Sequence, residues 1–219
     1  MESNKRVSII DRLNDNYIKV IVNLSLPLNE RKSLGLYLQL TLQFGLDNHD
    51  KAIENAYFVD LVNRDNFCKH IIGEPYRVVI PEDDSNEIAA TKASTLTTFH
   101  NHPDSFAPSD DDYKLFLRHG SIINMAVCGH SGNLYFLRKS IPFHTGMKEY
   151  ATEFLDKFKK TTIQMFYDYR IKRGYTVEQV TENRELTKEC VTAVMDEFFD
   201  AFCARLDKFE FKYYREGMM

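Results

Sequence analysis

The chain has 219 residues, of which 43% are hydrophobic and 27% are charged, and this composition is typical of a folded protein rather than a disordered one. A formal net charge of −4 at pH 7 argues against a protein that coats nucleic acid or binds an anionic membrane surface. No apolar run approaches the roughly 20 residues that cross a bilayer, and the first residues lack the pattern of a signal peptide, so we expect a cytoplasmic protein.

The first half of the chain is expected to mix strands with helices. The β-branched stretch IKVIVNLSL, residues 18–26, favours a strand. Residues 28–44 favour a helix, although alternating leucines compete there with the helical period. Two further strands are expected at residues 52–62 and 71–81, with the turn NRDN between them. The acidic segment EDDSNE that follows is expected to be a solvated loop or the start of a helix.

A strand followed by a helix is expected in the middle of the chain. Residues 95–100, TLTTFH, favour a strand that runs directly into HNHP. Ser109 is a natural N-cap, and the carboxylates of the following DDD fill the first helical turn, where the helix dipole favours negative charge. The helix is expected to end near Gly120. The segments INMAVCG and LYFLRKS, joined by HSGN, then favour a β-hairpin.

After about residue 145 the pattern changes to that of two long amphipathic helices. Thr176 and Gln179 stand in the capping-box relation. We therefore divide the chain into residues 1–145 and a helical C-terminal region, residues 146–219, whose apolar stripes are expected to pack on the first part or on another chain. The first stripe comprises Tyr150, Phe154, Phe158, Met165, Phe166 and Tyr169, and the second comprises Val191, Val194, Met195, Phe198, Phe202, Leu206 and Phe209.

Two histidines at the end of the expected strand, His100 and His102, are the strongest candidates for chemistry. Residues i and i+2 of a strand face the same side, so both imidazoles can reach one ion, and neutral imidazole is a common ligand of zinc. Pro103 ends the strand, and a carboxylate in the first turn of the next helix, at Asp112, can turn back toward the histidines. Two nitrogens and one oxygen leave a fourth position open to water, which is typical of catalytic zinc.

The segment HNHP followed by SDDD resembles the signature of the JAMM or MPN+ (JAB) zinc metallopeptidases, in which an upstream Glu is followed by HxHP and then SxxD. The HNHP form is similar to RadC-like and phage-associated bacterial members. The resemblance covers residues 50–140, with two departures. Asn101 stands where eukaryotic deubiquitinases usually have Ser or Thr, and the gap from His102 to Ser109 is one residue shorter than the commonest spacing.

This resemblance implies an α/β fold in which helices flank a mixed β-sheet, with cytidine-deaminase-like layering, so that residues 1–145 form the zinc domain. It also implies that His100, His102 and a carboxylate of the DDD run bind zinc. Among the three candidates in that run, Asp110, Asp111 and Asp112, the SxxD relation selects Asp112.

Two further roles follow from the resemblance. Ser109 is implied to hydrogen-bond the developing oxyanion or the bound water. An upstream Glu is implied to act as general base on that water. Glu54, at the start of the strand expected at residues 52–62, is the leading candidate for the base, and Glu74 and Glu87 are its competitors.

These roles predict a zinc-dependent metallopeptidase or isopeptidase that hydrolyses a peptide or isopeptide bond with zinc-activated water. The expected partner is a protein or peptide, and ubiquitin-like tails are the substrates of the family's best-known members, whereas the acidic balance disfavours nucleic acid. Two alternatives stay open. One is a RadC-like metal-bound module of a mobile-element or DNA-repair context without peptidase activity. The other is a non-catalytic scaffold that works through the aromatic-rich C-terminal helices, which also offer a surface for a homo-oligomer.

The remaining histidines and the cysteines are expected to be structural. His119 lies at a helix C-terminus, and His49, His130 and His144 lie in turn-like segments, where a lone histidine is seldom a ligand. The four cysteines contain no CxxC pair, and Cys128 lies in an apolar run, so a cysteine-only zinc site has no support.

Overall fold

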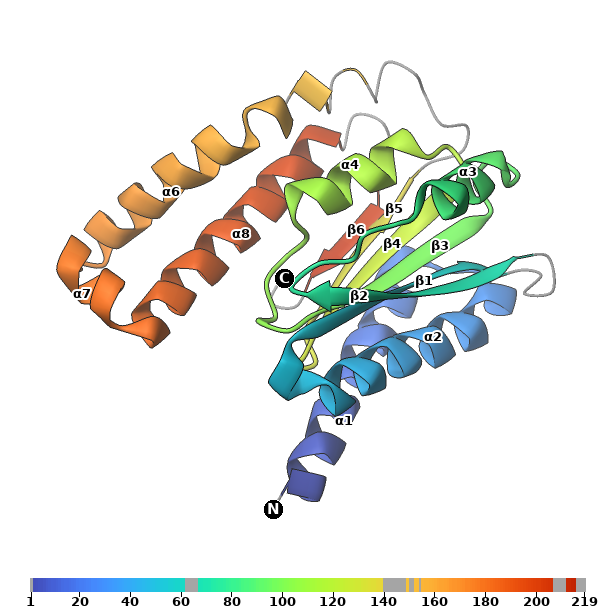
Figure 1. Cartoon of the computed structure of the whole chain (residues 1–219), viewed down its shortest axis with the longest axis horizontal. Helices are drawn as coiled ribbons and strands as arrows, with labels where there is room; N and C mark the ends of the chain where they lie inside the picture. Colours follow the sequence, from blue (N-terminus) through green and yellow to red (C-terminus); the bar gives the residue numbers. More distant parts are fainter. Residues whose placement is uncertain are drawn as a thin grey trace.

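The computed structural model describes residues 2–61, 67–139, 149, 152–153, 155–206 and 212–215. Helices flank a six-stranded mixed sheet, which confirms the predicted α/β class (Figure 1). The strand order is β2-β1-β3-β4-β5-β6. The strands are β1 (Ile53–Asp60), β2 (Cys68–Pro75), β3 (Leu96–His102), β4 (Ile122–Gly129), β5 (Leu134–Arg138) and β6 (Lys212–Arg215).

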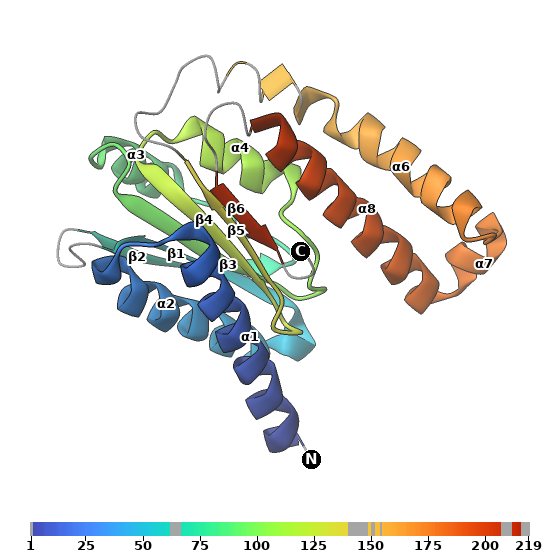
Figure 2. The ribbon, with the colours of Figure 1, turned by 180° about the vertical axis from the view of Figure 1, so that it is seen from behind.

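The helices lie on both faces of this sheet. α1 and α2 cover one face, α4 and α8 cover the other, and α8 lies between α6 and the sheet (Figures 1 and 2). Within the described ranges, no helix is both long enough and apolar enough to cross a membrane. The helices are α1 (Glu2–Leu24), α2 (Leu28–Asp47), the short 3-10 helix η1 (His49–Lys51), α3 (Glu82–Ala90), α4 (Asp110–Arg118), α6 (Phe158–Lys172), α7 (Val177–Glu182) and α8 (Arg184–Leu206).

The connection between β3 and β4 decides where the sequence motifs meet. These two strands are parallel, whereas the other neighbouring strands of the sheet are antiparallel. Parallel strands need a crossover connection, and here the loop after β3 and helix α4 supply it. The carboxyl end of β3, with HNHP, and the amino end of α4, with SDDD, therefore come together.

The predicted strand at residues 18–26 is wrong, because this segment belongs to helix α1, which runs to Leu24. Leu13, Val20 and Leu24 are buried at helical spacing and pack into the core between the helix layer and the sheet. Packing of this stripe outweighs the strand preference of the β-branched residues. The helix predicted at residues 28–44 is confirmed as α2.

The strand predicted at residues 71–81 is shifted in the structure. β2 begins at Cys68 and ends at Pro75. Tyr76 then has a positive φ of 60°, which turns the chain out of the sheet, and residues 78–80 lie outside its hydrogen-bonded ladder. The acidic segment EDDSNE forms the start of a helix, α3, which is one of the two outcomes expected for it.

The C-terminal helices are confirmed, with one addition. Phe198 and Phe202 of α8 are fully buried in the same core cluster as Tyr113 of α4, so the second apolar stripe packs on the sheet domain. The capping box of Thr176 and Gln179 is present at the start of α7. Strand β6, which the sequence did not predict, pairs with β5 and extends the sheet. The predictions for Tyr150, Phe154, Phe209 and the boundary at residues 145/146 lie outside the described residues.

Candidate metal centre

Three elements bring the candidate residues to one face of the sheet. His100 and His102 lie at the end of β3. β1 pairs antiparallel with β3 so that Ala56 lies opposite His100. Glu54, two residues before Ala56, therefore shares the face of the two histidines. Asp112 reaches the same place from the first turn of α4.

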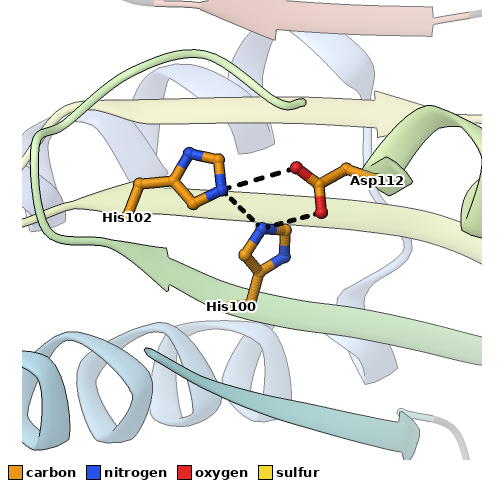
Figure 3. A group of neighbouring side chains, drawn as sticks. All are labelled: His100, His102 and Asp112. Atoms are coloured by element: carbon orange, nitrogen blue, oxygen red, sulfur yellow. Dashed lines mark hydrogen bonds and ion pairs between the residues drawn. The ribbon is translucent and has the colours of Figure 1, made fainter. Parts of the chain in front are cut away.

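The donor atoms of His100, His102 and Asp112 converge on one point (Figure 3). His100 Nε2 lies 2.9 Å from His102 Nε2 and 3.1 Å from Asp112 Oδ1. His102 Nε2 lies 3.4 Å from Asp112 Oδ2. A tetrahedral zinc ion with bonds of about 2.0–2.1 Å sets its donor atoms about 3.3 Å apart. The observed separations therefore suit three ligands of a single ion.

The second nitrogen of His102 supports the same arrangement. His102 Nδ1 lies 2.9 Å from the carbonyl oxygen of Phe106, which can only accept, so Nδ1 carries a proton and Nε2 faces the cluster. A contact of this kind orients the histidine ligands of metals. Burial lowers the pKa of His102, but hydrogen bonding to Asp112 and the charges of Asp112 and Glu54 outweigh it and raise the pKa to about 9. A metal cation bound there therefore takes the place of a proton.

Asp112 is held by the cap of its own helix. The hydroxyl of Ser109 donates to Asp112 Oδ2 over 2.8 Å, and the backbone N–H of Ser109 donates to the same oxygen over 2.6 Å. Burial raises the pKa of Asp112, but the charge of His100 and hydrogen bonds from both histidines outweigh it and hold the pKa well below its usual range. The carboxylate is therefore ionised and oriented, with Oδ2 on the cap and Oδ1 toward His100.

The neighbouring aspartates point elsewhere. Asp110 lies 2.6 Å from the ammonium of Lys114, and Asp111 lies 3.6 Å from it with 89% of its side chain exposed. Asp112 is thus the carboxylate of the DDD run that joins the histidines, as the SxxD relation selects. The hydroxyl of Ser109 donates to Asp112, so its predicted contact with an oxyanion or water stays a prediction.

Glu54 lies beside the cluster and is only 8% exposed. Burial raises the pKa of its carboxyl; the charges of His102 and His100 lower it, and that of Asp112 raises it further. A buried carboxyl with a raised pKa, close to a candidate metal ion, is suited to exchange a proton near neutral pH.

The two competitors of Glu54 lie in other surroundings. Glu74 has a side chain that is 70% exposed and lies 3.9 Å from Arg77. Glu87 is 54% exposed and pairs with Lys69. The described residues that line the cavity beside the cluster include Glu54 but neither competitor.

That cavity has a volume of about 810 Å³. Side chains of β1 and β3 form its floor, and residues 76–80 and the loop before α4 form its walls. Gly73 of β2 allows the wall formed by residues 76–80 to lie close to this strand, because a Cβ at Gly73 would lie 2.3 Å from the carbonyl oxygen of Arg77. The volume falls within the range of about 300–1,000 Å³ that is usual for ligand sites. The cluster therefore has a side that is open to a substrate.

Sequence reasoning missed Thr98 on the cavity floor. Thr98 is 1% exposed, and its Oγ1 has no hydrogen-bond partner among the residues that the structure describes. It lies two residues before His100 on the same strand and so faces the same side. Strand alternation could have placed Thr98 on the same face as His100, but it does not show whether the hydroxyl has a hydrogen-bond partner.

The remaining histidines and cysteines lie outside the cluster. His130 bonds to His49 and Asn101, and His119 is the C-cap of α4. Cys128 is buried as predicted, whereas Cys68 is exposed. His144 lies outside the described residues. Among the described residues, His100, His102 and Asp112 form the group whose donor atoms lie close enough together to hold one metal ion.

Comparisons with protein-family models, with curated proteins and with solved structures find no match to this chain. The resemblance to the JAMM metallopeptidases consequently stays a prediction. The observations on which a function can be proposed are the geometry of the cluster, the buried carboxyl beside it and the cavity that they line.

Proposed function

We propose that this chain is a zinc-dependent hydrolase of the JAMM type that cleaves a peptide or isopeptide bond. One observation carries the proposal. The donor atoms of His100, His102 and Asp112 converge beside a cavity, and the buried carboxyl of Glu54 lies on the floor of the same cavity. A structural zinc site has four protein ligands, whereas three ligands beside an open cavity are typical of a catalytic one.

Each residue of the site has its own role in the proposed reaction. His100, His102 and Asp112 would hold the zinc ion, which would supply a Lewis acid that activates water near neutral pH. Glu54 accepts the proton from the attacking water and then donates it to the leaving amine, a role suited to its raised pKa. Ser109 keeps Asp112 in place through two hydrogen bonds to Oδ2.

The main chain along one wall of the cavity supports a peptide substrate. The charges of the lining are mixed, because the carboxylates of the aspartates there are accompanied by the cations of Arg77, Lys114 and Arg118, so the backbone carries the argument. Residues 78–80 form one wall outside the ladder of the sheet, so their main-chain groups are placed to pair with a peptide laid in the cavity.

Metal analysis is the first test. Protein prepared without chelator should contain about one zinc ion per chain, and His102→Ala should lose it because three ligands become two. His49→Ala is the matched control, since this histidine contacts His130 and lies outside the cluster, and it should keep its zinc. The proposal fails if the parent protein neither contains zinc nor binds it in a titration.

Hydrolysis is the second test. The zinc-loaded protein should cleave at least one member of a panel of extended peptides, isopeptide-linked peptides and ubiquitin-like fusions. Removal of zinc by a chelator should stop the cleavage, and added zinc should restore it. Zinc binding without cleavage of any panel member would contradict the peptidase assignment and favour a metal-bound module without peptidase activity.

A further inference from the structure

Asn101 lies between the two histidines of β3, and its side chain points to the opposite face of the sheet because side chains alternate along a strand. There it contacts the backbone of β1. Asn101 Oδ1 accepts a hydrogen bond from the backbone N–H of Asn55 over 2.8 Å, and Asn101 Nδ2 donates to the carbonyl oxygen of Ile53 over 3.1 Å. Ile53 and Asn55 are the residues on either side of Glu54. One side-chain amide thus bridges the peptide units that flank the candidate base.

The bridge lies where the regular ladder stops. The pairing of β1 with β3 runs from Asp60 opposite Leu96 to Ala56 opposite His100, and it ends before Glu54. On the other side, the pairing of β1 with β2 is irregular between Ile53 and Asn55. The side chain of Asn101 therefore takes over from the ladder in holding this end of β1.

The amide of Asn101 is itself held in one orientation. The side-chain amide of Asn55 donates to Asn101 Oδ1 over 2.6 Å, and Asn101 Nδ2 lies 2.8 Å from His130 Nε2. Burial, together with the charges of His49 and His102, lowers the pKa of His130 to about 4, so its ring is a neutral acceptor for that donor. Both oxygen and nitrogen of the amide are engaged, and Asn101 has no exposed surface.

Helix α2 closes over this amide with a glycine. A Cβ at Gly45 would lie 2.3 Å from His130 Nε2 and 2.7 Å from Asn101 Nδ2. Any larger residue at this position must displace the pair. Gly45 thus gives a way to disturb the Asn101 amide from the helix layer, on the face of the sheet opposite the candidate metal ligands.

We propose that Asn101 is a positioning residue for Glu54: its side-chain amide fixes the backbone on both sides of Glu54 and so sets the carboxyl beside the metal ligands. The proposal rests on the proposed hydrolase function for its catalytic consequence. It makes residue 101 the link between the strand that carries the ligands and the strand that carries the base. A serine or threonine at this position is too short to make both bonds.

Hydrogen exchange tests the bridge without any need for activity. In Asn101→Ala the backbone N–H of Asn55 loses its acceptor, so its exchange should accelerate by about tenfold relative to other β1 amides. Asn124→Ala is the matched control: Asn124 is also buried in the same sheet, at 1% exposed, but its amide donates to the Thr97 hydroxyl over 2.9 Å. This control should leave exchange at Asn55 unchanged. Unaltered exchange at Asn55 in Asn101→Ala overturns the bridge.

Kinetics test whether the bridge acts through Glu54. Asn101→Ala should retain zinc and lower kcat by about ten- to a hundredfold with KM nearly unchanged, because the base is displaced while substrate binding is not. Added to Glu54→Gln, it should cause less than about a twofold further loss, since two residues that act as one unit are not additive. If Asn101→Ala folds poorly, Gly45→Ala replaces it and is expected to lower kcat in the same way but to a smaller extent.

The outcomes separate the two proposals. Independent, multiplicative losses in the double variant would show that Asn101 does not work through Glu54 and would overturn the positioning role. A zinc-loaded parent without hydrolytic activity overturns the proposed function and, with it, the catalytic role of Asn101, while the exchange at Asn55 still decides whether the bridge exists.

Discussion

Replacement of Glu54 by Gln separates proton transfer from metal binding. Gln keeps the length and shape of the side chain but cannot accept a proton at neutral pH. Loss of a general base lowers kcat by about 10²–10⁴-fold, which corresponds to about 2.7–5.4 kcal/mol in activation free energy. The buried carboxyl is costly to ionise, as its raised pKa shows, so Gln should also leave the stability of the fold unchanged or higher.

The assay is zinc content together with the cleavage rate on whichever substrate the parent hydrolyses. Glu54→Gln should keep close to full zinc occupancy, because Glu54 is outside the ligand cluster. Asp112→Asn is the comparison, since it weakens a ligand and should lose zinc and activity together. Full activity in Glu54→Gln would refute the assignment of the base. Zinc loss in that variant would instead make Glu54 a ligand.

Two other predictions follow from buried side chains. Thr98→Val removes a buried hydroxyl that has no partner among the described residues, so it should not lower the melting temperature, and zinc content should stay unchanged. A lower melting temperature would show that this hydroxyl makes a stabilising hydrogen bond. Phe198→Ala should lower the free energy of unfolding, measured in urea, by about 3–5 kcal/mol, because Phe198 is fully buried against Tyr113 and Phe158. Ile171 is 65% exposed, so Ile171→Ala should change this free energy by less than about 0.5 kcal/mol. Equal effects of the two variants would place the helical region outside the core.

The site was predictable from the sequence because each part of it is local. Strand alternation places His100 and His102 on one face, and the N-cap at Ser109 fixes where the next helix begins. A helix of 3.6 residues per turn then sets Asp112 in its first turn. Only the link from β1 to β3 is long-range. The sequence named Glu54 as the leading candidate for the base, and the structure adds that its carboxyl is buried beside the cluster.

The elements that were predicted wrongly or missed depend on contacts between residues far apart in the sequence. Residues 18–24 are helical because the apolar side chains of α1 pack on the sheet. The sequence of the segment 18–26 alone does not reveal this contact with distant residues. Strand β6 is short, and it is stabilised by pairing with β5 about eighty residues earlier in the chain. The sequence identified Asn101 only as a departure from the motif. Its role as a bridge was not predictable, because its hydrogen-bond partners lie in β1 and after β4.

The cap of α4 explains how a cluster of this kind can be held ready for an ion. In a capping box the third residue of the helix returns a side-chain oxygen to the N-cap, and here that residue is Asp112. Its Oδ2 satisfies two donors of Ser109, which leaves Oδ1 directed at His100. The hydrogen bonds that begin the helix therefore also orient the third candidate ligand, and the positive end of the helix dipole favours its ionised carboxylate. Because that orientation is part of folding, binding of the ion does not have to order Asp112, and the entropy cost of ordering a free side chain is absent.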